Sequence, residues 1–493
     1  MNKTKNSRDL ANVSYLLNTF KILLLLLPCW AMAQNQAPNV VLIVVDDLGW
    51  VDVGYNDHTG VFHTPNIDAL AAKSAVFTNA YAGAANCAPS RAVLMSGQYS
   101  PRHGVYTVNS SERGNEKTRK IIPEPNTPLL DDSIVTMAEM FKSNGYTTGT
   151  FGKWHLGEDP KTQGFDHNVA GYTAGHPNSY FSPYNMPHLT DGPDGEYLPN
   201  RITSELISWI TQVKEQAFFA YVPYYTVHTP IQAIESVKEK YLSHPRIRDS
   251  RHATYAAMVE LMDINIGRIV RSLEQQNLMD NTLLVFTSDN GGIRAIAHQD
   301  PLRGGKGSYY EGGVRVPLVI SWPKKIKAKI DATPVVNADF YPTFAKLIGA
   351  DVSNQILDGA DLSALLLEEK PLATRNLYWH FPIYLQAYSP IADQNRDPLF
   401  RTRPGSSMRQ GNWKLHHYFE DNSYELYNLE SDLGEHVNLA PYLPNKVKAL
   451  AAEMQSWRES INAPVPTQAN PKYDAEFTAK YTEQRLLKTK GKK

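Results

Sequence analysis

The chain is poor in cysteine, with only two among its 493 residues. Cys29 lies in an apolar run near the N-terminus, and Cys87 lies in the stretch AANCAPSRAVLMSG over residues 84–97. If the N-terminal run is removed as a signal peptide, Cys87 has no partner for a disulfide within the chain. This excludes a disulfide framework and leaves Cys87 as either an inert buried thiol or a residue with a chemical role.

An excess of charge of one sign is also missing. The formal net charge is −1, which gives no electrostatic basis for binding nucleic acid or an anionic membrane surface. Internal repeats and low-complexity segments are absent from the sequence as well. With 42% hydrophobic and 20% charged residues, the composition is that of an ordinary globular protein, long enough for about two or three domains.

A long apolar run is missing at the N-terminus, where the sequence has only one short apolar run. This run, ILLLLLPCWAMA over residues 22–33, is too short to span a bilayer comfortably. Basic residues precede it, and Ala31 and Ala33 form a small-residue cleavage site before Gln34. A membrane anchor is the alternative to a signal peptide here. We expect a signal peptide over residues 1–33 and an exported protein, periplasmic or extracellular, with no stable membrane span after cleavage.

Strand and helix patterns alternate along most of the chain. NVVLIVVDDLG over residues 39–49 is a continuous β-branched run, typical of a strand buried on both faces of a parallel sheet. TLLVFTSDNGG over residues 282–292 repeats this pattern, and amphipathic helical segments lie between the two. The alternation predicts an α/β fold with a large doubly wound, mostly parallel sheet flanked by helices.

The pattern changes after about residue 370. RNLYWHFPIY, SMRQGNWKLHHYF and SYELYNL read as short aromatic strands, and PNKVKALAAEMQSWRESI reads as a helix. We therefore expect a catalytic domain over residues 37–370 and a smaller α+β domain with an antiparallel sheet over residues 371–465. A polar, basic tail over residues 466–493 is expected to be poorly ordered.

Oxygen ligands follow the two strand patterns described first. Asp46 and Asp47 follow the first, and Asp289 and Asn290 follow the second. Because ligands of doubly wound sheets sit beyond the carboxyl ends of the strands, these side chains are expected at one edge. Two acids after a strand are often only a solvated turn, but the set as a whole suits Ca²⁺ or Mg²⁺ rather than zinc.

Cationic residues are expected near the same edge. Lys153 and His155 lie two apart in FGKWHLG, so both point to one side of an extended segment. His228 follows a strand pattern in VHTP, and Lys306 lies in the glycine-rich loop LRGGKGSYYEGG. Each alone would be read as solvated surface, but together, beside acids that could hold a metal, they indicate a pocket for an anion.

Cys87 stands at the start of a predicted helix that ends at Gly97. Pro89 is well placed in a first turn, and the helix dipole favours a negative charge at this end. Arg91 lies one turn further on. The residues alone are therefore consistent with a thiolate nucleophile.

The stretch CAPSRAVLMSG resembles the signature of the formylglycine-dependent sulfatases, a branch of the alkaline phosphatase superfamily. In that signature, Cys-x-Pro-Ser-Arg directs oxidation of the cysteine to Cα-formylglycine. VDDLG, GKWHLG, HTP, SDNGG and GGKGSYYEGGVRVPLVISWP lie in the family's order, and ELYNLESDLGEHVNL resembles its C-terminal domain. The resemblance runs from about Pro38 to about Ile461 and is to secreted bacterial polysaccharide sulfatases.

The resemblance implies a metal site and a set of catalytic roles. Ca²⁺, with Mg²⁺ possible, would be held by Asp46, Asp47, Asp289, Asn290 and the modified Cys87. One hydroxyl of the hydrated aldehyde would attack sulfur, and His228, with Lys306, would protonate the leaving oxygen. His155 would help the second hydroxyl to expel sulfate. Arg91 and Lys153 would hold the hydrated aldehyde in place. Together with Lys306, they would also supply positive charge to the site.

The resemblance also implies partners. Cys87 would be the substrate of a formylglycine-generating or anaerobic sulfatase-maturating enzyme. The enzyme's own substrate would be a sulfated polysaccharide or its oligosaccharides, and His176, Arg294 and His298 are candidate carbohydrate contacts, or ordinary loop residues. Two alternatives stay open: a phosphate or phosphonate ester hydrolase of the same superfamily, and a catalytically silent glycan-binding protein.

Overall fold

The structure is a computed structural model that describes residues 37–490. The predicted signal peptide over residues 1–33 lies outside the described residues. The chain from Pro38 onward forms one compact unit, and the predicted boundary near residue 370 stays a prediction. Within the described part, none of the helices has the length and apolar character needed to cross a membrane.

An eight-stranded sheet forms the centre of the unit, in the order β5-β4-β6-β1-β7-β8-β2-β9. The strands β5 to β7 of this order pair in parallel, and only β8 runs against its neighbours. The predicted mostly parallel α/β sheet is thereby confirmed. In sheet order, the strands span His167–Val169, Thr147–Phe151, Phe218–Pro223, Asn39–Val45, Thr282–Ser288, Leu318–Ser321, Ala75–Phe77 and Lys329–Asp331.

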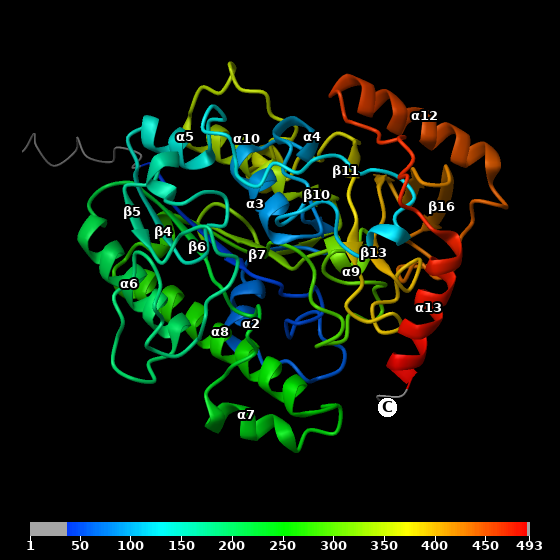
Figure 1. Ribbon diagram of the computed structural model, residues 1–493. Helices are drawn as coiled ribbons and strands as arrows, with labels where there is room; N and C mark the ends of the chain where they lie inside the picture. The colour runs from blue at the N-terminus through cyan, green and yellow to red at the C-terminus, as the bar shows by residue number, and fades with distance from the viewer. Residues whose placement is uncertain (1–36, 491–493) are drawn as a thin grey trace, which may run out of the picture. The chain divides into compact units, whose positions relative to one another are not determined.

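Helices cover both faces of this sheet (Figure 1). One layer packs into a core with one face: α2 (Pro65–Ala71), α6 (Leu198–Val213) and α8 (Ser250–Gln275), with α7 (Glu235–Leu242) against α8. The other layer consists of α3 (Cys87–Ser96), α5 (Met137–Ser143), α10 (Phe340–Ile348) and α11 (Ser363–Leu367). This double cover explains why the central strands read as continuous apolar runs rather than as alternating ones.

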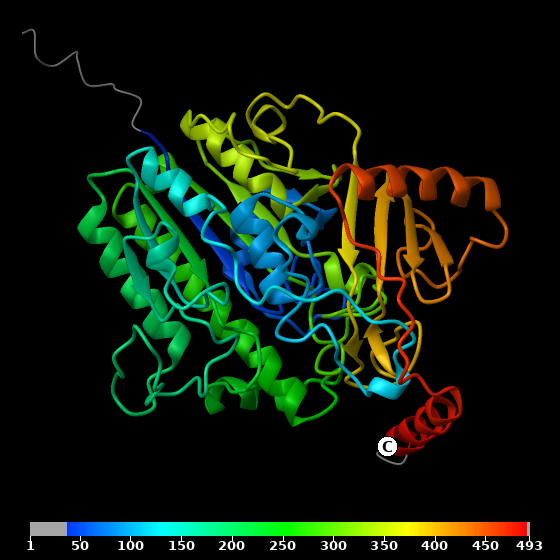
Figure 2. The ribbon, with the colours of Figure 1, turned by 45° about the horizontal axis from the view of Figure 1, so that its top comes forward.

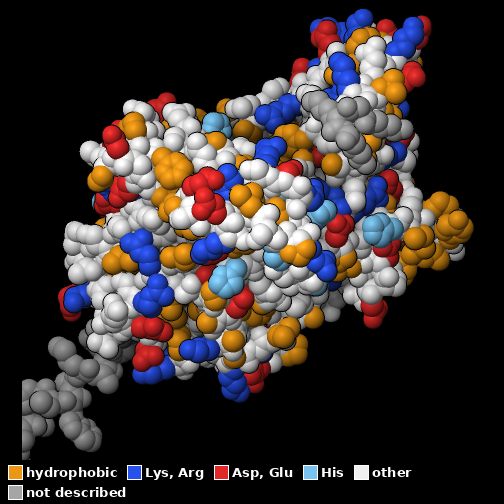
Figure 3. Space-filling model, turned by 90° about the horizontal axis from the view of Figure 1, so that it is seen from below, with side chains coloured by type: hydrophobic (Ala, Val, Ile, Leu, Met, Phe, Trp, Pro, Cys, Tyr) orange, Lys and Arg blue, Asp and Glu red, His pale blue; other side chains and the backbone are white. Residues whose placement is uncertain are grey.

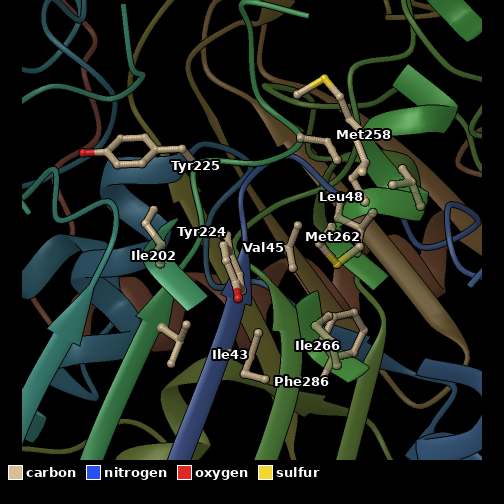
Figure 4. Close-up of a cluster of buried hydrophobic side chains, with 14 of the residues drawn as sticks. Ile43, Val45, Leu48, Ile202, Tyr224, Tyr225, Met258, Met262, Ile266 and Phe286 are labelled. Atoms are coloured by element: carbon tan, nitrogen blue, oxygen red, sulfur yellow. The ribbon is translucent and has the colours of Figure 1, made fainter. Parts of the chain in front are cut away.

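Strand β1 divides its side chains between the two cores. Val41, Ile43 and Val45 belong to the core under α8, and the intervening Val40, Leu42 and Val44 belong to the opposite core. Figure 4 shows Ile43 and Val45 beside side chains of α8 and of β7. Because successive strand residues point to opposite faces, every apolar residue of β1 is buried, and each contributes about 1.5–3 kcal/mol of burial free energy.

Short elements complete this part of the chain. Helix α5 begins at Met137, where Thr136 and Glu139 form a reciprocal capping box. Two small ladders pair β3 (Ala80–Tyr81) with β10 (Val335–Val336) and β12 (Leu385–Gln386) with β13 (Phe400–Thr402). The remaining short helices are α4 (Ser100–His103), α9 (Glu311–Val314), η1 (Glu116–Thr118), η2 (Pro160–Gln163), η3 (Met279–Asn281) and η4 (Asn337–Asp339).

A four-stranded antiparallel sheet follows, in the order β11-β14-β15-β16, as predicted. It spans Asn376–Phe381, Gly405–Gln410, Trp413–Tyr418 and Ser423–Asn428, and α12 (Pro444–Ser460) packs on it (Figure 2). Met408, Leu415 and Leu426 form a core with α12. Apolar side chains of β11 instead join a core with Tyr81 of β3 and Val93 of α3.

The expectation of a poorly ordered tail is wrong for residues 466–490, and residues 491–493 lie outside the described part. Residues Ala475–Lys490 form helix α13, with Phe477 and Tyr481 stacked one turn apart. The segment before it is also fixed, because the Asn470 side chain donates to the carbonyl oxygens of Glu116 and Arg119. The composition of the tail could not predict this order, because these hydrogen bonds join segments that are far apart in the sequence.

The face seen in Figure 3 carries Lys, Arg, Asp and Glu side chains interspersed with one another. No field of a single sign dominates it, in keeping with the net charge of −1. On this face, the structure adds no electrostatic argument for a nucleic-acid partner.

A buried ion cluster joins the antiparallel sheet to the part of the chain that contains the large sheet. Lys414 of β15 has a fully buried side chain, and its Nζ lies 2.8 Å from Glu311 Oε1 and 3.2 Å from Glu435 Oε1. Glu311 also pairs with Arg315 at 2.8 Å. Opposite charges with several partners each can compensate one another's desolvation in this way.

We expect Lys414→Met to destabilise the protein by about 3–5 kcal/mol, because it leaves buried carboxylates without their shared cation. Urea unfolding followed by fluorescence measures the change. Lys448→Met removes an exposed lysine of α12 and should leave the unfolding midpoint almost unchanged. Equal midpoints for the two variants would contradict a stabilising role for this cluster.

Candidate functional site

The four predicted oxygen ligands meet at one edge of the large sheet. Strands β1 and β7 pair in parallel with Val45 opposite Ser288, so the residues that follow both strands emerge together. The Asp47 backbone N–H lies 3.2 Å from Asp289 Oδ1, and Asn290 Nδ2 donates to Asp47 Oδ1 at 2.8 Å. All four side chains are buried.

Cys87 is the first residue of α3, which ends at Gly97 in the left-handed conformation, as the sequence predicts. The Cys87 side chain is almost fully buried, and the thiol and one oxygen each of Asp46 and Asp289 lie within 4.8 Å of one another. The N-terminal end of the helix therefore brings Cys87 to the carboxylates.

Three buried cations pair with the three acids. Arg91 Nε and Nη2 each lie 2.9 Å from Asp289 Oδ2. Lys153 Nζ lies 2.7 Å from Asp46 Oδ2, and Lys306 Nζ lies 2.8 Å from both oxygens of Asp47. With three carboxylates balanced by three cations, the charges of these side chains sum to zero.

The carboxyl groups of Asp46 and Asp47 have opposite pKa shifts. Burial raises the pKa of Asp46 well above its ordinary value, because Asp289 and Asp47 add to that effect and Lys153 only partly offsets it. Burial also acts on Asp47, but Lys306, His228 and Lys153 hold its pKa below the ordinary value. A divalent cation bound beside Asp46 would oppose this upward shift and favour the carboxylate form.

Two buried oxygens of this group accept no hydrogen bond from the described residues: Asp46 Oδ1 and Asn290 Oδ1. Arg91 Nη2 lies 4.0 Å from Asp46 Oδ1. Buried acceptors are normally satisfied, and carboxylate and amide oxygens are the ligands of Ca²⁺ and Mg²⁺. The residues present therefore fit a hard divalent cation.

Two histidines lie beside the acids. His228 Nδ1 lies 2.8 Å from the Thr229 carbonyl oxygen and so donates to it, which leaves Nε2, 3.6 Å from Asp47 Oδ2, facing the site. Burial and the charge of Lys306 lower the pKa of His228 to about 3. Burial, Lys153 and Arg91 likewise hold the pKa of His155 well below its ordinary value. Both rings are therefore neutral in this arrangement.

His155 is held tightly, but not in the extended conformation expected from FGKWHLG. Its φ angle is 64°, in the left-handed region, and its backbone N–H donates to the Tyr172 carbonyl. A Cβ on Gly175 would meet the His155 ring at 2.6 Å, so Gly175 gives the ring its space. The turn still brings Lys153 and His155 to the same site.

A pocket of about 410 Å³ has Cys87 in its lining. Four further predicted residues line it: His155, His176, His228 and Lys306. Among the described residues, no Asp or Glu does so. The pocket therefore offers cationic and imidazole groups to an entering molecule, as an anion pocket requires.

Arg294 and His298 do not line this pocket. Arg294 is buried and donates to the Leu302 carbonyl and to Asp300. His298 lines a separate hollow of about 390 Å³ with Phe62 and His252. Their role as carbohydrate contacts stays a prediction.

Arg113 and Tyr388 line the Cys87 pocket but were missed by sequence reasoning. Arg113 lies in the mixed-charge stretch SSERGNEKTRK, and Tyr388 in the irregular stretch PIYLQAYSP. Neither stretch has a period or motif that separates a pocket residue from its neighbours.

The loop that carries Lys306 is fixed from three sides. The Lys306 N–H donates to the Gly292 carbonyl at 2.8 Å, and the Gly307 N–H donates to the Ala85 carbonyl at 2.7 Å. Arg401 Nη1, from β13, donates to the Lys306 carbonyl at 2.8 Å. Residues near the large sheet and the later strand β13 thus position this lysine together.

Comparison with protein families gives two matches. The family model described as "Sulfatase" matches residues 38–350, and the model described as "N-sulphoglucosamine sulphohydrolase, C-terminal" matches residues 305–462. The first match contains every residue of the acid and cation groups described above.

Individual relatives agree with these matches. A "Sulfatase" of Formosa agariphila is 34% identical over 90% of this chain and 93% of its own length. The N-acetylgalactosamine-6-sulfatase of Homo sapiens is 30% identical over 71% of this chain and 69% of its own length. Among solved structures, Ps i-CgsB in complex with k-i-k-neocarrahexaose has a TM-score of 0.71 and 29% identity, covering 91% of this chain and 97% of that one.

Proposed function

This chain belongs to the sulfatases, a family of the alkaline phosphatase superfamily, and sulfatases hydrolyse sulfate esters. We therefore propose that it removes sulfate from a sulfated polysaccharide or its oligosaccharides. The observation that carries the proposal is the pocket that joins Cys87 to cationic and imidazole groups without any lining carboxylate among the described residues. A sulfate ester is an anion, and such a pocket complements it.

The names of similar proteins support a glycan as the substrate. One relative is named an N-acetylgalactosamine-6-sulfatase, and one solved structure is described as a complex with k-i-k-neocarrahexaose. These names describe those proteins, and this chain shares their family and fold. We therefore propose a sulfated glycan rather than a small aryl sulfate as its natural substrate.

We propose that Cys87 is oxidised to Cα-formylglycine by a formylglycine-generating or anaerobic sulfatase-maturating enzyme. The motif Cys-Ala-Pro-Ser-Arg over residues 87–91 supports this, as does the place of Cys87 among carboxylates and cations. The hydrated aldehyde would supply one hydroxyl to attack sulfur and a second whose deprotonation releases sulfate, a route that an unmodified serine or cysteine does not offer.

A divalent cation, Ca²⁺ or Mg²⁺, would be held by Asp46, Asp47, Asp289, Asn290 and the modified residue 87. The unsatisfied oxygens of Asp46 and Asn290 support this assignment. A bound cation would polarise a sulfate oxygen and offset the repulsion between the carboxylates and the anionic substrate. Since the acid and cation side chains sum to zero charge, the ion would also give the site its net positive charge.

The remaining side chains would bind the substrate and move protons. Arg91 and Lys153 would hold residue 87 and the sulfate in place, because both are buried and fixed by ion pairs. The anionic substrate would favour the protonated form of His228, whose Nε2–H, with Lys306, would then donate a proton to the leaving oxygen, and His155 would take a proton from the hydroxyl that remains on residue 87. Both histidines line the pocket from which the substrate would enter.

We also propose that the protein is exported, to the periplasm or beyond the cell. The proposal rests on the basic, apolar and small-residue segment over residues 1–33. A polymeric glycan outside the cell would then be accessible to the enzyme.

Measurement of sulfate release from a panel of defined sulfated oligosaccharides tests the proposed function. We expect release from at least one oligosaccharide at a kcat/KM above that for 4-nitrophenyl sulfate. 4-Nitrophenyl phosphate should be turned over far more slowly than the aryl sulfate. Preference for the phosphate would contradict the proposal, and so would release from the aryl sulfate alone.

A further inference from the structure

Arg113 is an arginine in the active-site pocket that pairs with nothing in the described part of the chain. It lines the same pocket as Cys87 and Lys306 and is half-buried. Its guanidinium has neither a hydrogen bond nor an ion pair with any residue between 37 and 490. Other arginines around the site, such as Arg91 and Arg401, are all engaged. A free guanidinium in a pocket without lining carboxylates is a ready binding group for an anion.

The backbone on both sides of Arg113 is fixed. Arg119 Nη1 donates to the Glu112 carbonyl at 2.7 Å and to the Gly114 carbonyl at 3.0 Å. Arg119 Nη2 also lies 3.4 Å from Glu112 Oε2, so the neighbouring carboxylate is already paired. Gly114 packs against the Phe400 ring, which a Cβ there would meet at 2.6 Å. The loop is therefore preorganised to present Arg113.

Tyr388 lies in the same pocket lining and presents an open aromatic face. Its exposed fraction is 52%, and one face of its ring lies over the Arg401 guanidinium, 3.5 Å from the ring centroid. Arg401 in turn donates to the Lys306 carbonyl, and the Tyr388 N–H donates to Asp393 Oδ2 at 2.7 Å. These contacts hold the half-exposed ring beside Lys306, and among residues 37–490 only Arg401 stacks on it, which leaves the other face for a sugar ring.

We propose that Arg113 and Tyr388 form a glycan subsite, in which Tyr388 stacks against a sugar ring and Arg113 pairs with an anionic group of the glycan other than the sulfate that is hydrolysed. The anionic group would be a second sulfate or a uronate carboxylate, since both match the guanidinium fork. The proposal rests on the proposed function and narrows it. The preferred substrate is a glycan that carries at least two anionic groups.

Neutral and singly charged ligands would use this subsite poorly. An aryl monosulfate places its only anion at Cys87 and offers nothing to Arg113. A glycan with a second anion gains a charge-assisted, bidentate contact and ring stacking together. Because these contacts lie away from the reacting sulfur, they are expected to act mainly on KM.

Kinetics on three matched substrates test the subsite: a disulfated disaccharide, a disaccharide with one sulfate and one uronate, and 4-nitrophenyl sulfate. For Arg113→Gln we expect the loss in kcat/KM on a doubly anionic disaccharide to exceed the loss on the aryl ester by about tenfold or more, mostly through KM. Which of the two disaccharides is affected identifies the anion. Arg113→Lys should lose less kcat/KM than Arg113→Gln, since lysine keeps the positive charge but lacks the paired N–H groups of the guanidinium.

Two further comparisons keep the test specific. Tyr388→Ala should raise KM for the disaccharides more than Tyr388→Phe, which retains the ring. Lys120→Gln, at an exposed lysine outside the pocket lining, should leave kcat/KM on all three substrates unchanged, and thermal unfolding of every variant checks its fold.

If Arg113→Gln lowers kcat/KM equally on all three substrates, the subsite is overturned while the proposed function stands. If the wild type releases sulfate only from the aryl ester, the proposed function fails and the subsite fails with it.

Discussion

Replacing Cys87 with alanine is expected to abolish sulfate release, with kcat falling by a factor on the order of 10⁴–10⁶. The physical reason is that alanine cannot be oxidised to an aldehyde, so no hydroxyl is available to attack sulfur. The fold should survive, because the change removes one buried sulfur atom and should cost about 1 kcal/mol. Sulfate release and thermal unfolding of the purified variant, side by side with the wild type, measure both effects.

A control variant in the same helix separates chemistry from packing. Within the described residues, the Ser96 hydroxyl bonds only to the Ala92 carbonyl and to the Gln98 N–H, so Ser96→Ala should retain nearly full activity. Peptide mass analysis should find residue 87 about 18 Da lighter than cysteine in active protein, the mass difference between CH₂SH and CHO. Fully active protein with an unmodified cysteine would refute the proposed nucleophile.

If the proposed metal is bound, its removal with a chelator is expected to lower kcat/KM by about 10²–10³-fold, because a bound divalent cation would supply several kcal/mol of charge stabilisation. The charge balance of the site gives the reason. With three acids and three cations paired, the site without an ion has no net charge with which to attract sulfate. Activity after separate addition of Ca²⁺ and Mg²⁺ shows which ion serves.

Thermal stability gives a readout of the same site that does not depend on turnover. A cation at 100 times its Kd should stabilise the folded state by about 2.7 kcal/mol, and Asp289→Asn should weaken that response. Asp300→Asn, at a carboxylate outside the pocket lining, should retain it. If metal-free protein, verified by elemental analysis, keeps its full activity, the metal assignment is wrong.

The sequence was informative where chemistry follows a regular element. Asp46, Asp47, Asp289 and Asn290 could be placed together because β1 and β7 are apolar on both faces and run in parallel. The apolar pattern predicts two buried parallel strands, and the carboxyl ends of parallel strands lie at the same edge of a sheet. Cys87 could be placed at a helix start because Pro89 and Gly97 mark the two ends of α3.

The sequence was uninformative where a residue is placed by contacts between distant segments. Arg113 and Tyr388 share a pocket because Arg119 and Arg401 fix their loops. The helical or strand periodicity of a sequence gives no information about such contacts. Helix α13 was missed for a related reason. Its composition is polar, so its order depends on contacts such as that of Thr478 Oγ1 with the Lys117 carbonyl, which a reading of local composition omits.

The burial of α3 has a consequence for the order of events in the cell. All ten of its residues are buried, and Ser90 Oγ accepts a hydrogen bond from Asn337 of the distant η4 turn at 3.0 Å. An enzyme that reads Cys87–Arg91 as a linear motif can reach it only before this part of the chain has folded, or after local unfolding. If Cys87 is oxidised as we propose, the oxidation would therefore have to precede the folding of this part of the chain. Protein folded in a cell without the maturating enzyme should stay inactive when that enzyme is supplied afterwards.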